Sequence, residues 1–95
     1  MNDRDLVQQL RRLRRCMEQL QSEFEHQQLD RQLLHDIDTL MENGVTADER
    51  AYQLRDRTDS LRELVLVTGT RNHLEAVRRC VQLKKLIDAL IADIG

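Results

Sequence analysis

Three groups of side chains in this sequence are candidates for chemistry: a run of arginines, a Glu-x-x-His pair and two cysteines. The run is Arg11-Arg12-Leu13-Arg14-Arg15. Clustered guanidinium groups bind phosphate by charge and by paired hydrogen bonds, so this basic patch could bind a nucleic acid. Four later basic residues could enlarge the surface, namely Arg78, Arg79, Lys84 and Lys85.

The composition of the chain argues against a nucleic-acid site. The net charge is −2, no aromatic residue stands beside the arginines, and the chain has no glycine-rich phosphate loop. The arginines also have a simpler interpretation, which is a solvated helix face or a face that meets the acidic stretch 23–49 of a second protomer. A nucleic-acid-associated regulator that uses Arg11, Arg12, Arg14 and Arg15 is therefore the second hypothesis for function.

The segment Glu23-Phe24-Glu25-His26 contains Glu-x-x-His, a spacing that puts two metal ligands on one helical face. Di-iron bundles need this motif twice, together with two further inward glutamates, and the sequence has one copy. His35 beside Asp36, and His73 alone, complete no ligand set either. No Ser, His and carboxylate group can be assembled from the pattern. We therefore predict no metal, no cofactor and no enzymatic activity.

The two cysteines, Cys16 and Cys80, are isolated and lack the spacing of a zinc site or a disulfide framework. Arg12 and Arg15 would lower the pKa of Cys16 and favour a redox role or an intermolecular link. The alternative, which we prefer, is that each thiol fills a helix interface as a small apolar group. We predict a cytoplasmic protein without membrane insertion. The thiols are free, the sequence has no signal peptide, and no apolar run approaches the ~18 residues of a membrane span.

The spacing of apolar residues predicts an all-α protein with a single domain over residues 1–95. The chain is rich in Leu, Arg, Glu and Gln and has two aromatic residues, a composition typical of long helices and coiled coils. The fold class is an antiparallel helical bundle or a long helical hairpin of three to four segments with coiled-coil-like packing. The predicted helical segments cover residues 3–27, 29–43, 47–68 and 71–94.

A tight hairpin is predicted at residues 43–46. Gly44 provides a left-handed helix stop, and Val45 stands at the separation from Leu40 at which such an end brings two apolar residues together. Thr46 begins a capping box for the next helix. Because stop and start nearly coincide, the two flanking helices should fold back antiparallel.

The other two boundaries carry weaker signals. Gly69 predicts a second helix stop, with Thr70 or Asn72 as the following cap. Residues 25–28 contain neither Gly nor Pro. A kink within one continuous helix and a break with a new start at Asp30 therefore both remain open.

The first segment carries apolar residues spaced by four and three, which is the pattern of a coiled-coil seam. Its members are Leu6, Leu10, Leu13, Met17, Leu20 and Phe24. If residues 3–43 formed one helix, it would be about 60 Å long, and neither later segment could cover the seam alone. We therefore predict a homodimer in which a second copy covers these six residues.

The last segment has an apolar arc wider than one neighbouring helix covers. We predict that this arc binds a helix of a partner protein through Leu83, Leu86, Ile87, Leu90, Ile91 and Ile94. The apolar run 64–67 is either buried on several sides or contacts a partner, and a short strand before Thr68-Gly69-Thr70 is a minor alternative. The first hypothesis for function is a non-enzymatic protein–protein interaction module: an adaptor, a regulator or a small secretion-type chaperone. Size and helix content resemble those of small helical export chaperones and of anti-activators, without a shared motif.

Overall fold

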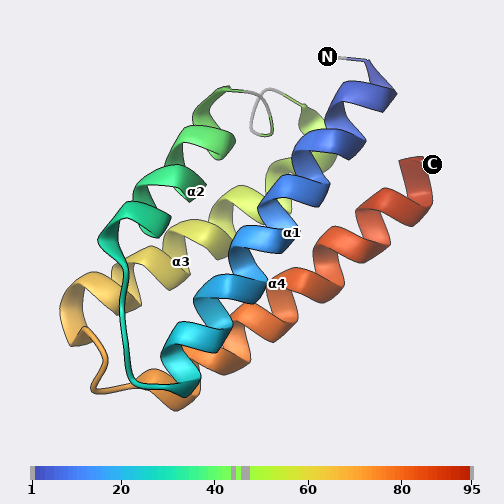
Figure 1. The fold of residues 1–95 in the computed structure, drawn as a ribbon. Coiled ribbons are helices and arrows are strands. Elements are labelled where there is room, and N and C mark those ends of the chain that lie inside the picture. The colour runs from blue at the N-terminus through green and yellow to red at the C-terminus, as the bar shows by residue number, and fades with distance from the viewer. Residues whose placement is uncertain (1, 44, 46–47, 95) are drawn as a thin grey trace.

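The computed structural model describes residues 2–43, 45 and 48–94. This part of the chain forms an all-α antiparallel bundle, as the sequence predicts. Its elements are α1 (Asp3–Glu25), α2 (Arg31–Asn43), a 3-10 turn η2 (Glu49–Ala51), α3 (Tyr52–Thr68) and α4 (His73–Ile94). The helices alternate in direction, and both termini lie at the same end (Figure 1). The most extensive contact is between α1 and α4, while α2 packs on α1 and α3 packs on α4.

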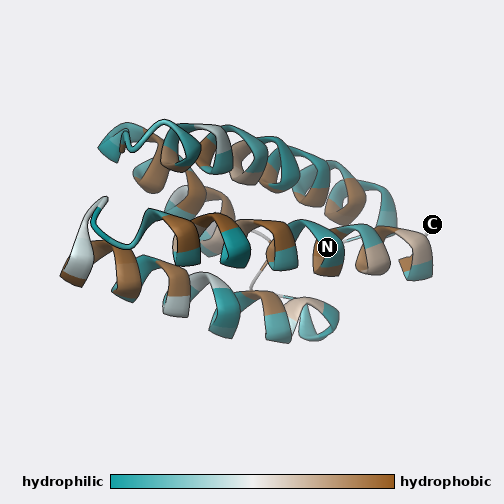
Figure 2. Cartoon of the chain, turned by 90° about the horizontal axis from the view of Figure 1, so that it is seen from below, coloured by the Kyte–Doolittle hydropathy of each residue, from teal (hydrophilic) through white to brown (hydrophobic). Residues whose placement is uncertain are grey.

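Each helix turns one apolar stripe toward the bundle axis, and polar residues cover the outside (Figure 2). α1 contributes the six residues of the predicted seam, and α4 contributes Ala76, Cys80, Leu83 and Ile87. Burial of each Leu, Met or Phe contributes about 1.5–3 kcal/mol to the stability of the fold. The α1–α4 pair is therefore the main source of stability.

The coiled-coil seam faces the chain's own core. Its side chains have no exposed surface, because α2 and α4 lie along α1 over most of its length. The residues concerned are Leu6, Leu10, Leu13, Met17, Leu20 and Phe24. The expectation of a bare seam was wrong, since it depended on one 60 Å helix that the chain does not form. These residues are not available to a second copy in this fold, whereas the oligomeric state stays a prediction.

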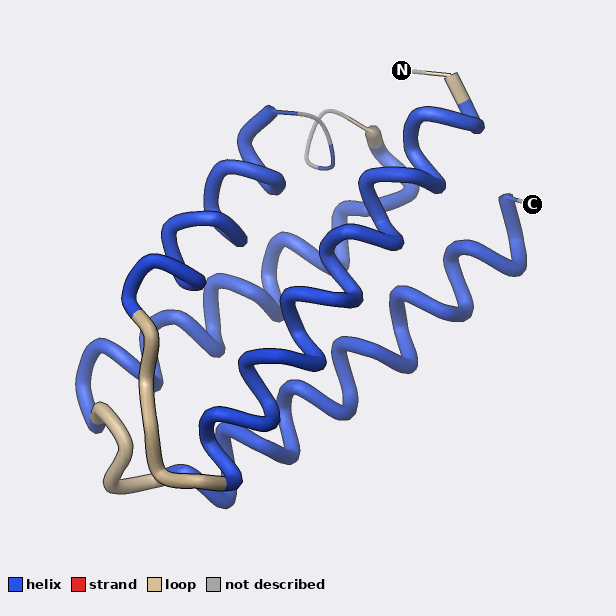
Figure 3. The backbone as a smooth tube through the Cα atoms, viewed as in Figure 1, coloured by secondary structure: helices blue, strands red, loops and turns tan. Residues whose placement is uncertain are grey.

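α1 ends in a left-handed turn without a glycine. The backbone N–H of Gln28 donates to the carbonyl of Glu23 at 2.8 Å, and that of Gln27 donates to the carbonyl of Phe24 at 3.0 Å. These two bonds form a Schellman motif, which requires a left-handed residue just past the helix end. Gln27 occupies that position with a φ of +56°. The turn separates α1 from α2 (Figure 3).

α2 begins with a cap from Asp30. The carboxylate of Asp30 accepts a hydrogen bond from the backbone N–H of Gln32 at 2.9 Å, and its own N–H donates to the carboxylate of Glu23 at 2.7 Å. Of the two alternatives for this region, the break with a new start at Asp30 is therefore confirmed. The continuous helix is excluded.

The predicted stop at Gly44 and cap at Thr46 lie outside the described residues. Val45, between them, is fully buried. The next described cap is Asp48, whose carboxylate accepts a hydrogen bond from the N–H of Arg50 at 2.9 Å. The turn η2 follows, and the third long helix therefore begins several residues later than the predicted residue 47.

Asp48 and Arg50 also connect the start of α3 to the start of α1. A guanidinium nitrogen of Arg50 lies 2.8 Å from the carboxylate of Asp48 and 3.0 Å from that of Asp3. Hydrogen bonds from Arg50 lower the pKa of Asp48 to about 2. The network therefore depends on an ionised Asp48.

Gly69 ends α3, as predicted. Its backbone has a φ of +57° and a ψ of −127°, a combination that residues with a Cβ strongly disfavour. Its N–H donates to the carbonyl of Val65 at 2.8 Å. At the start of α4 the carbonyl of Asn72 accepts from the N–H of Ala76 at 3.1 Å, so Asn72 stands at the N-cap position.

Candidate partner-binding groove

The side of the bundle between α2 and α3 is the least closely packed. α1 packs on α2 and on α4, and α3 packs on α4, but the backbones of α2 and α3 make little direct contact. Side chains of these two helices instead line two adjoining pockets of about 280 and 300 Å³, which share Asp38 and Arg62. We call the two pockets together the α2–α3 groove.

The groove has a polar half and an apolar half. The polar half lies toward the C-terminal end of α2 and is lined by Asp38, Met41, Glu42, Arg55, Thr58, Asp59 and Arg62. The apolar half lies toward the connection between α1 and α2 and is lined by Leu29, Arg31, Leu34, His35, Asp38, Arg62, Val65, Leu66 and Gly69.

One ion pair crosses the groove where the two halves meet. A guanidinium nitrogen of Arg62 lies 3.3 Å from the carboxylate of Asp38. The Arg62 side chain is 50% exposed and that of Asp38 is 27% exposed. Exposed pairs of this kind contribute about 0–1 kcal/mol. A ligand that offers its own charges or hydrogen bonds could therefore replace this pair at little energetic cost.

The rim of the apolar half carries exposed hydrophobic surface. Within the run 64–67, Val65 is buried and Leu64 is partly buried against the core. Leu66, which lines the pocket, is 70% exposed, and the neighbouring Val67, which does not line it, is 74% exposed. Successive helical residues point about 100° apart, so all four cannot face one core. Burial of the run on several sides is thus excluded. The all-round apolar run is the sequence signal for these two exposed residues, and contact with a partner is the alternative that stays open for them.

The floor of the polar half contains an unusual threonine. Thr58 is only 5% exposed, and its hydroxyl oxygen is buried without a hydrogen-bond partner among the described residues. Two other threonines within the helices donate to the carbonyl four residues earlier: Thr39 to His35 at 3.0 Å and Thr68 to Leu64 at 2.7 Å. Thr58 does not use this local solution.

The predicted partner-binding residues of α4 do not form one surface. Leu83 is 1% exposed and Ile87 is not exposed, because both pack into the core of the bundle. The prediction that these two residues contact a partner was therefore wrong. The C-terminal helix is a core element of the bundle over this part of its length.

The other four predicted residues of α4 are partly buried. Leu86 and Leu90 line a separate pocket of about 420 Å³ at the terminal end of the bundle, beside the 65% exposed Tyr52. Ile94 lines another pocket, against the first turns of α1, and Ile91 lies in neither. Only Leu86 and Leu90 are brought together at a pocket.

The basic patch is divided by acidic neighbours. Nε of Arg14 donates to the carboxylate of Asp88 at 2.7 Å, and the same guanidinium lies 3.6 Å from Glu18. Arg11, Arg12 and Arg15 are exposed and form no ion pair with any residue that the structure describes.

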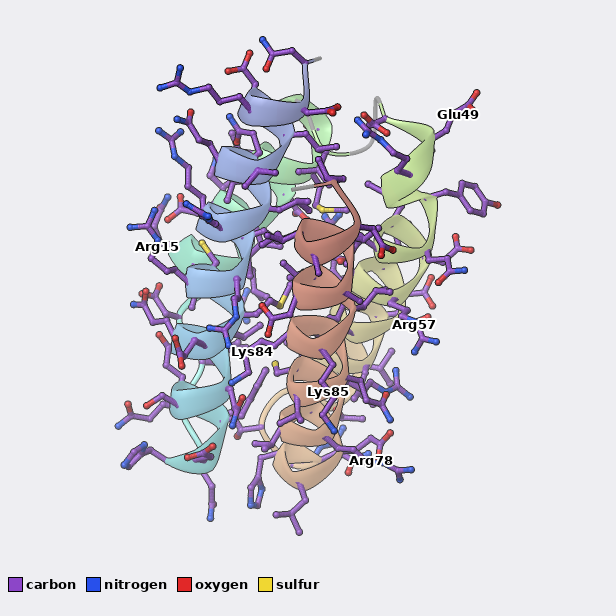
Figure 4. The ribbon with its side chains drawn as sticks, turned by 90° about the vertical axis from the view of Figure 1, so that its right-hand side faces the viewer. Arg15, Glu49, Arg57, Arg78, Lys84 and Lys85 are labelled. Atoms are coloured by element: carbon purple, nitrogen blue, oxygen red, sulfur yellow. The ribbon has the colours of Figure 1, made fainter. Side chains whose placement is uncertain are left out.

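The packing of α1 on α4 adds lysines to the same side of the molecule. In Figure 4, Arg15 points away from α1, Lys84 lies toward the boundary with α1, and Lys85 lies on the outer surface of α4. These cations are spread over the surface and do not converge on one point.

The two cysteines are free thiols. Burial raises the pKa of Cys16, with a further contribution from Asp36 that outweighs the lowering effect of Arg15. The prediction of a lowered pKa at Cys16 was wrong for this reason. Burial also raises the pKa of Cys80 to about 12. Neither environment favours a thiolate.

The Glu-x-x-His pair serves the turn after α1. Glu23 accepts the hydrogen bond from the N–H of Asp30, and Nδ1 of His26 lies 2.7 Å from the carbonyl oxygen of Ser22. Across the described ranges, no three His, Cys, Asp or Glu side chains come together as metal ligands.

Comparison of the chain with models of protein families, with curated proteins and with solved structures gave no match. The described helices also include none with the length and hydropathy needed to cross a membrane.

Proposed function

We propose that this chain is a non-enzymatic protein–protein interaction module that binds an amphipathic helix of a partner in the α2–α3 groove. The observation that carries the proposal is that Leu66, which is 70% exposed, lines an apolar pocket of about 300 Å³. Complete burial of a Leu or Val side chain contributes about 1.5–3 kcal/mol, so covering this rim favours binding. An adaptor, a regulator or a small secretion-type chaperone would each use such a surface.

The shape of the groove supports a helical ligand. Two antiparallel helices, α2 and α3, form its walls, as in other proteins that bind an amphipathic helix in an apolar groove. Such a ligand places apolar residues on one face, at spacings of three and four, and keeps its opposite face in solvent. Bound here, it would supply the packing that α2 and α3 do not give each other.

The test compares two charged substitutions at exposed apolar sites. The double variant Leu66→Asp/Val67→Asp should lose partner proteins that wild type captures from its native source, as quantified by mass spectrometry. Leu74→Asp is the matched control, because Leu74 is 75% exposed and lies outside the groove. All variants should keep the helical circular dichroism of wild type. Unchanged capture by the double variant would contradict the assignment of the groove.

A third variant tests the α4 site that the sequence favoured. Tyr52→Asp places a charge beside Leu86 and Leu90, at the other end of the molecule. Binding through the α2–α3 groove leaves capture by this variant unchanged. Loss of capture by Tyr52→Asp alone would move the site to the pocket between α3 and α4.

Homodimerisation remains part of the proposal, with a changed location. Since the seam of α1 is buried, we place the dimer contact at Leu66 and Val67, which are two of the exposed apolar residues of the described chain. Sedimentation at micromolar concentration measures the mass of wild type and of the double variant. If wild type is a dimer and the double variant is a monomer, a second copy of the chain occupies the groove. If wild type is a monomer, the prediction of a homodimer is wrong.

The second candidate function is binding of nucleic acid by the basic patch. The observation in its favour is the packing of α1 on α4, which puts Lys84 and Lys85 on the same side of the molecule as Arg15. Charge reversal at Arg11, Arg12 and Arg15, which leaves the paired Arg14 intact, should then abolish binding to duplex DNA. Affinity should also fall steeply with salt, as counterion release requires. Binding that is insensitive to either change would exclude this function.

A further inference from the structure

A pocket of about 200 Å³ lies between α3 and α4 and shares no residue with the α2–α3 groove. We call it the arginine pocket. It is lined by Arg57 and Ser60 of α3 and by Arg79, Gln82 and Leu83 of α4. In each helix the two polar residues stand three positions apart, so they project from the same side of that helix. Four side chains that can donate hydrogen bonds therefore surround the pocket, and none of its lining residues is acidic.

The guanidinium of Arg79 is held in place at one wall of the pocket. Nη1 donates to the carbonyl of Ser60 at 3.1 Å, and Nε donates to the carboxylate of Glu75 at 3.2 Å. The side chain is only 34% exposed. A guanidinium has five N–H groups, so three of them make no bond to a described residue. These free donors have a fixed orientation before any ligand arrives, which reduces the entropy lost on binding.

Arg57, at the opposite wall, has no acidic neighbour along its helix. A helical arginine commonly pairs with a carboxylate three or four residues away, as Arg79 does with Glu75. The positions three and four residues from Arg57 hold no acid on either side. The exposed guanidinium accordingly forms no hydrogen bond or ion pair with any residue that the structure describes. Arg57 and Arg79 repel each other across the pocket, and an anion between them would replace this repulsion by attraction.

Two further cations flank the pocket on the α4 side. Arg78 and Lys85 stand four and three residues from Gln82, so they belong to the same side of α4. Figure 4 shows both of them on the face of the molecule that also carries Arg57. Cations from two helices therefore contribute to a positive potential around one pocket, which favours an anionic ligand.

We propose that the arginine pocket binds the phosphate group of a phosphate monoester. Such a group has a charge between about −1.5 and −2 and three acceptor oxygens, which match two guanidinium groups together with the neutral donors Ser60 and Gln82. A carboxylate has one charge and two oxygens and would leave donors unused. The pocket volume is about six times the ~30 Å³ that one water molecule occupies in the liquid, so it also admits the first atoms beyond the phosphate.

The experiment is an NMR titration of the ¹⁵N-labelled protein at constant ionic strength. The probes are inorganic phosphate, glycerol 3-phosphate and a short uncharged peptide with one phosphoserine, and acetate is the control anion. The Nε–H signals of Arg57 and Arg79 and the backbone amides of Ser60 and Gln82 should shift and saturate with the phosphates and stay unchanged with acetate. Tighter binding of the peptide would identify a phosphorylated protein as the source of the phosphate, and tighter binding of glycerol 3-phosphate would identify a small molecule.

Three variants test whether the pocket itself binds the phosphate. Arg57→Gln should weaken binding about tenfold, because a hydrogen bond between charged groups is lost. Arg57→Lys keeps the charge but not the paired donors, and it should weaken binding about threefold. Arg55→Gln is the matched control, since it removes the same charge from the same helix outside the pocket and should leave affinity unchanged. Arg57 makes no bond within the described chain, so its variants should keep the melting temperature of wild type.

Three results would overturn the assignment: the absence of saturable shifts with every phosphate, equal affinity of wild type and Arg57→Lys, or equal losses in Arg57→Gln and Arg55→Gln. The last two would indicate a general effect of positive charge. The inference goes beyond the proposed function and does not depend on it. Leu66→Asp/Val67→Asp, which tests the groove, should bind the phosphates as wild type does, so either site can fail without the other.

Discussion

Replacement of Gln27 by glycine should stabilise the bundle. Gln27 has a φ of +56° in the Schellman turn that ends α1. For a residue with a Cβ, this left-handed conformation costs about 1–2 kcal/mol relative to the right-handed one. Glycine avoids that cost but gives the unfolded chain more freedom, which destabilises by about 0.4–1 kcal/mol. The difference predicts a net gain of about 0.5–1 kcal/mol for Gln27→Gly.

Equilibrium urea unfolding, followed by circular dichroism, measures this gain. The transition midpoint should rise with an unchanged slope, and the melting temperature should rise by about 2–8 °C in a domain of this size. The turn is exposed at Gln27, so no change in core packing enters the comparison.

Gln28→Gly is the matched control for this prediction. Gln28 is the next residue, is also exposed, and has a negative φ. Glycine there gains no relief from strain and should lower stability by about 0.4–1 kcal/mol through the unfolded chain alone. The reasoning is refuted if Gln27→Gly is no more stable than wild type, or if the two variants shift stability by the same amount.

Three further predictions concern a turn, a salt bridge and the thiols. Gly69→Ala should lower the free energy of unfolding in urea by about 1–3 kcal/mol, because its backbone conformation suits glycine alone. The contribution of Asp48 should be complete above about pH 4 and lost as the pH falls toward 2, since Arg50 lowers its pKa from the unfolded value of about 3.9. In the variant Asp48→Asn, the urea midpoint should therefore change less with pH over this range than in wild type. With a thiol-specific reagent at pH 8, Cys80 should react more slowly than Cys16, since its pKa is about 12; equal rates would contradict this burial.

The sequence predicted the helices well because burial of an apolar stripe is a local, periodic property. Every residue of the seam in α1 is indeed buried, and Gly69 ends α3 as its type suggests. What covers each stripe is not local information. The seam of α1 is covered by α2 and α4 of the same chain, and this arrangement depends on the break at Gln27. A glutamine gives no sequence signal for a left-handed turn.

The groove could be predicted only in part. The apolar run at the end of α3 indicated a surface that one core cannot bury, and this surface is its rim. The polar half was not predicted, because Thr58 counts as an ordinary member of a helical stripe when hydrogen bonds are unknown. The wide apolar arc of α4 was misread for the opposite reason. Its width reflects contact with both α1 and α3, and such sharing is not encoded in the spacing of Leu83 and Ile87.

The two candidate surfaces differ in how well their exposed groups are accommodated by the chain and by water alone. On the basic face, Asp88 and Glu18 already pair with Arg14, and the remaining cations are solvated, as surface charges are at no energetic penalty. In the groove, by contrast, water does not remedy the exposed Leu66 or the buried hydroxyl of Thr58. Both residues lie on α3, slightly more than two helical turns apart, on the side where α2 gives little contact. An amphipathic helix in the groove would cover Leu66, whereas a nucleic acid on the basic face would not. For this reason the groove, and not the arginine run, is the surface by which we expect this chain to act.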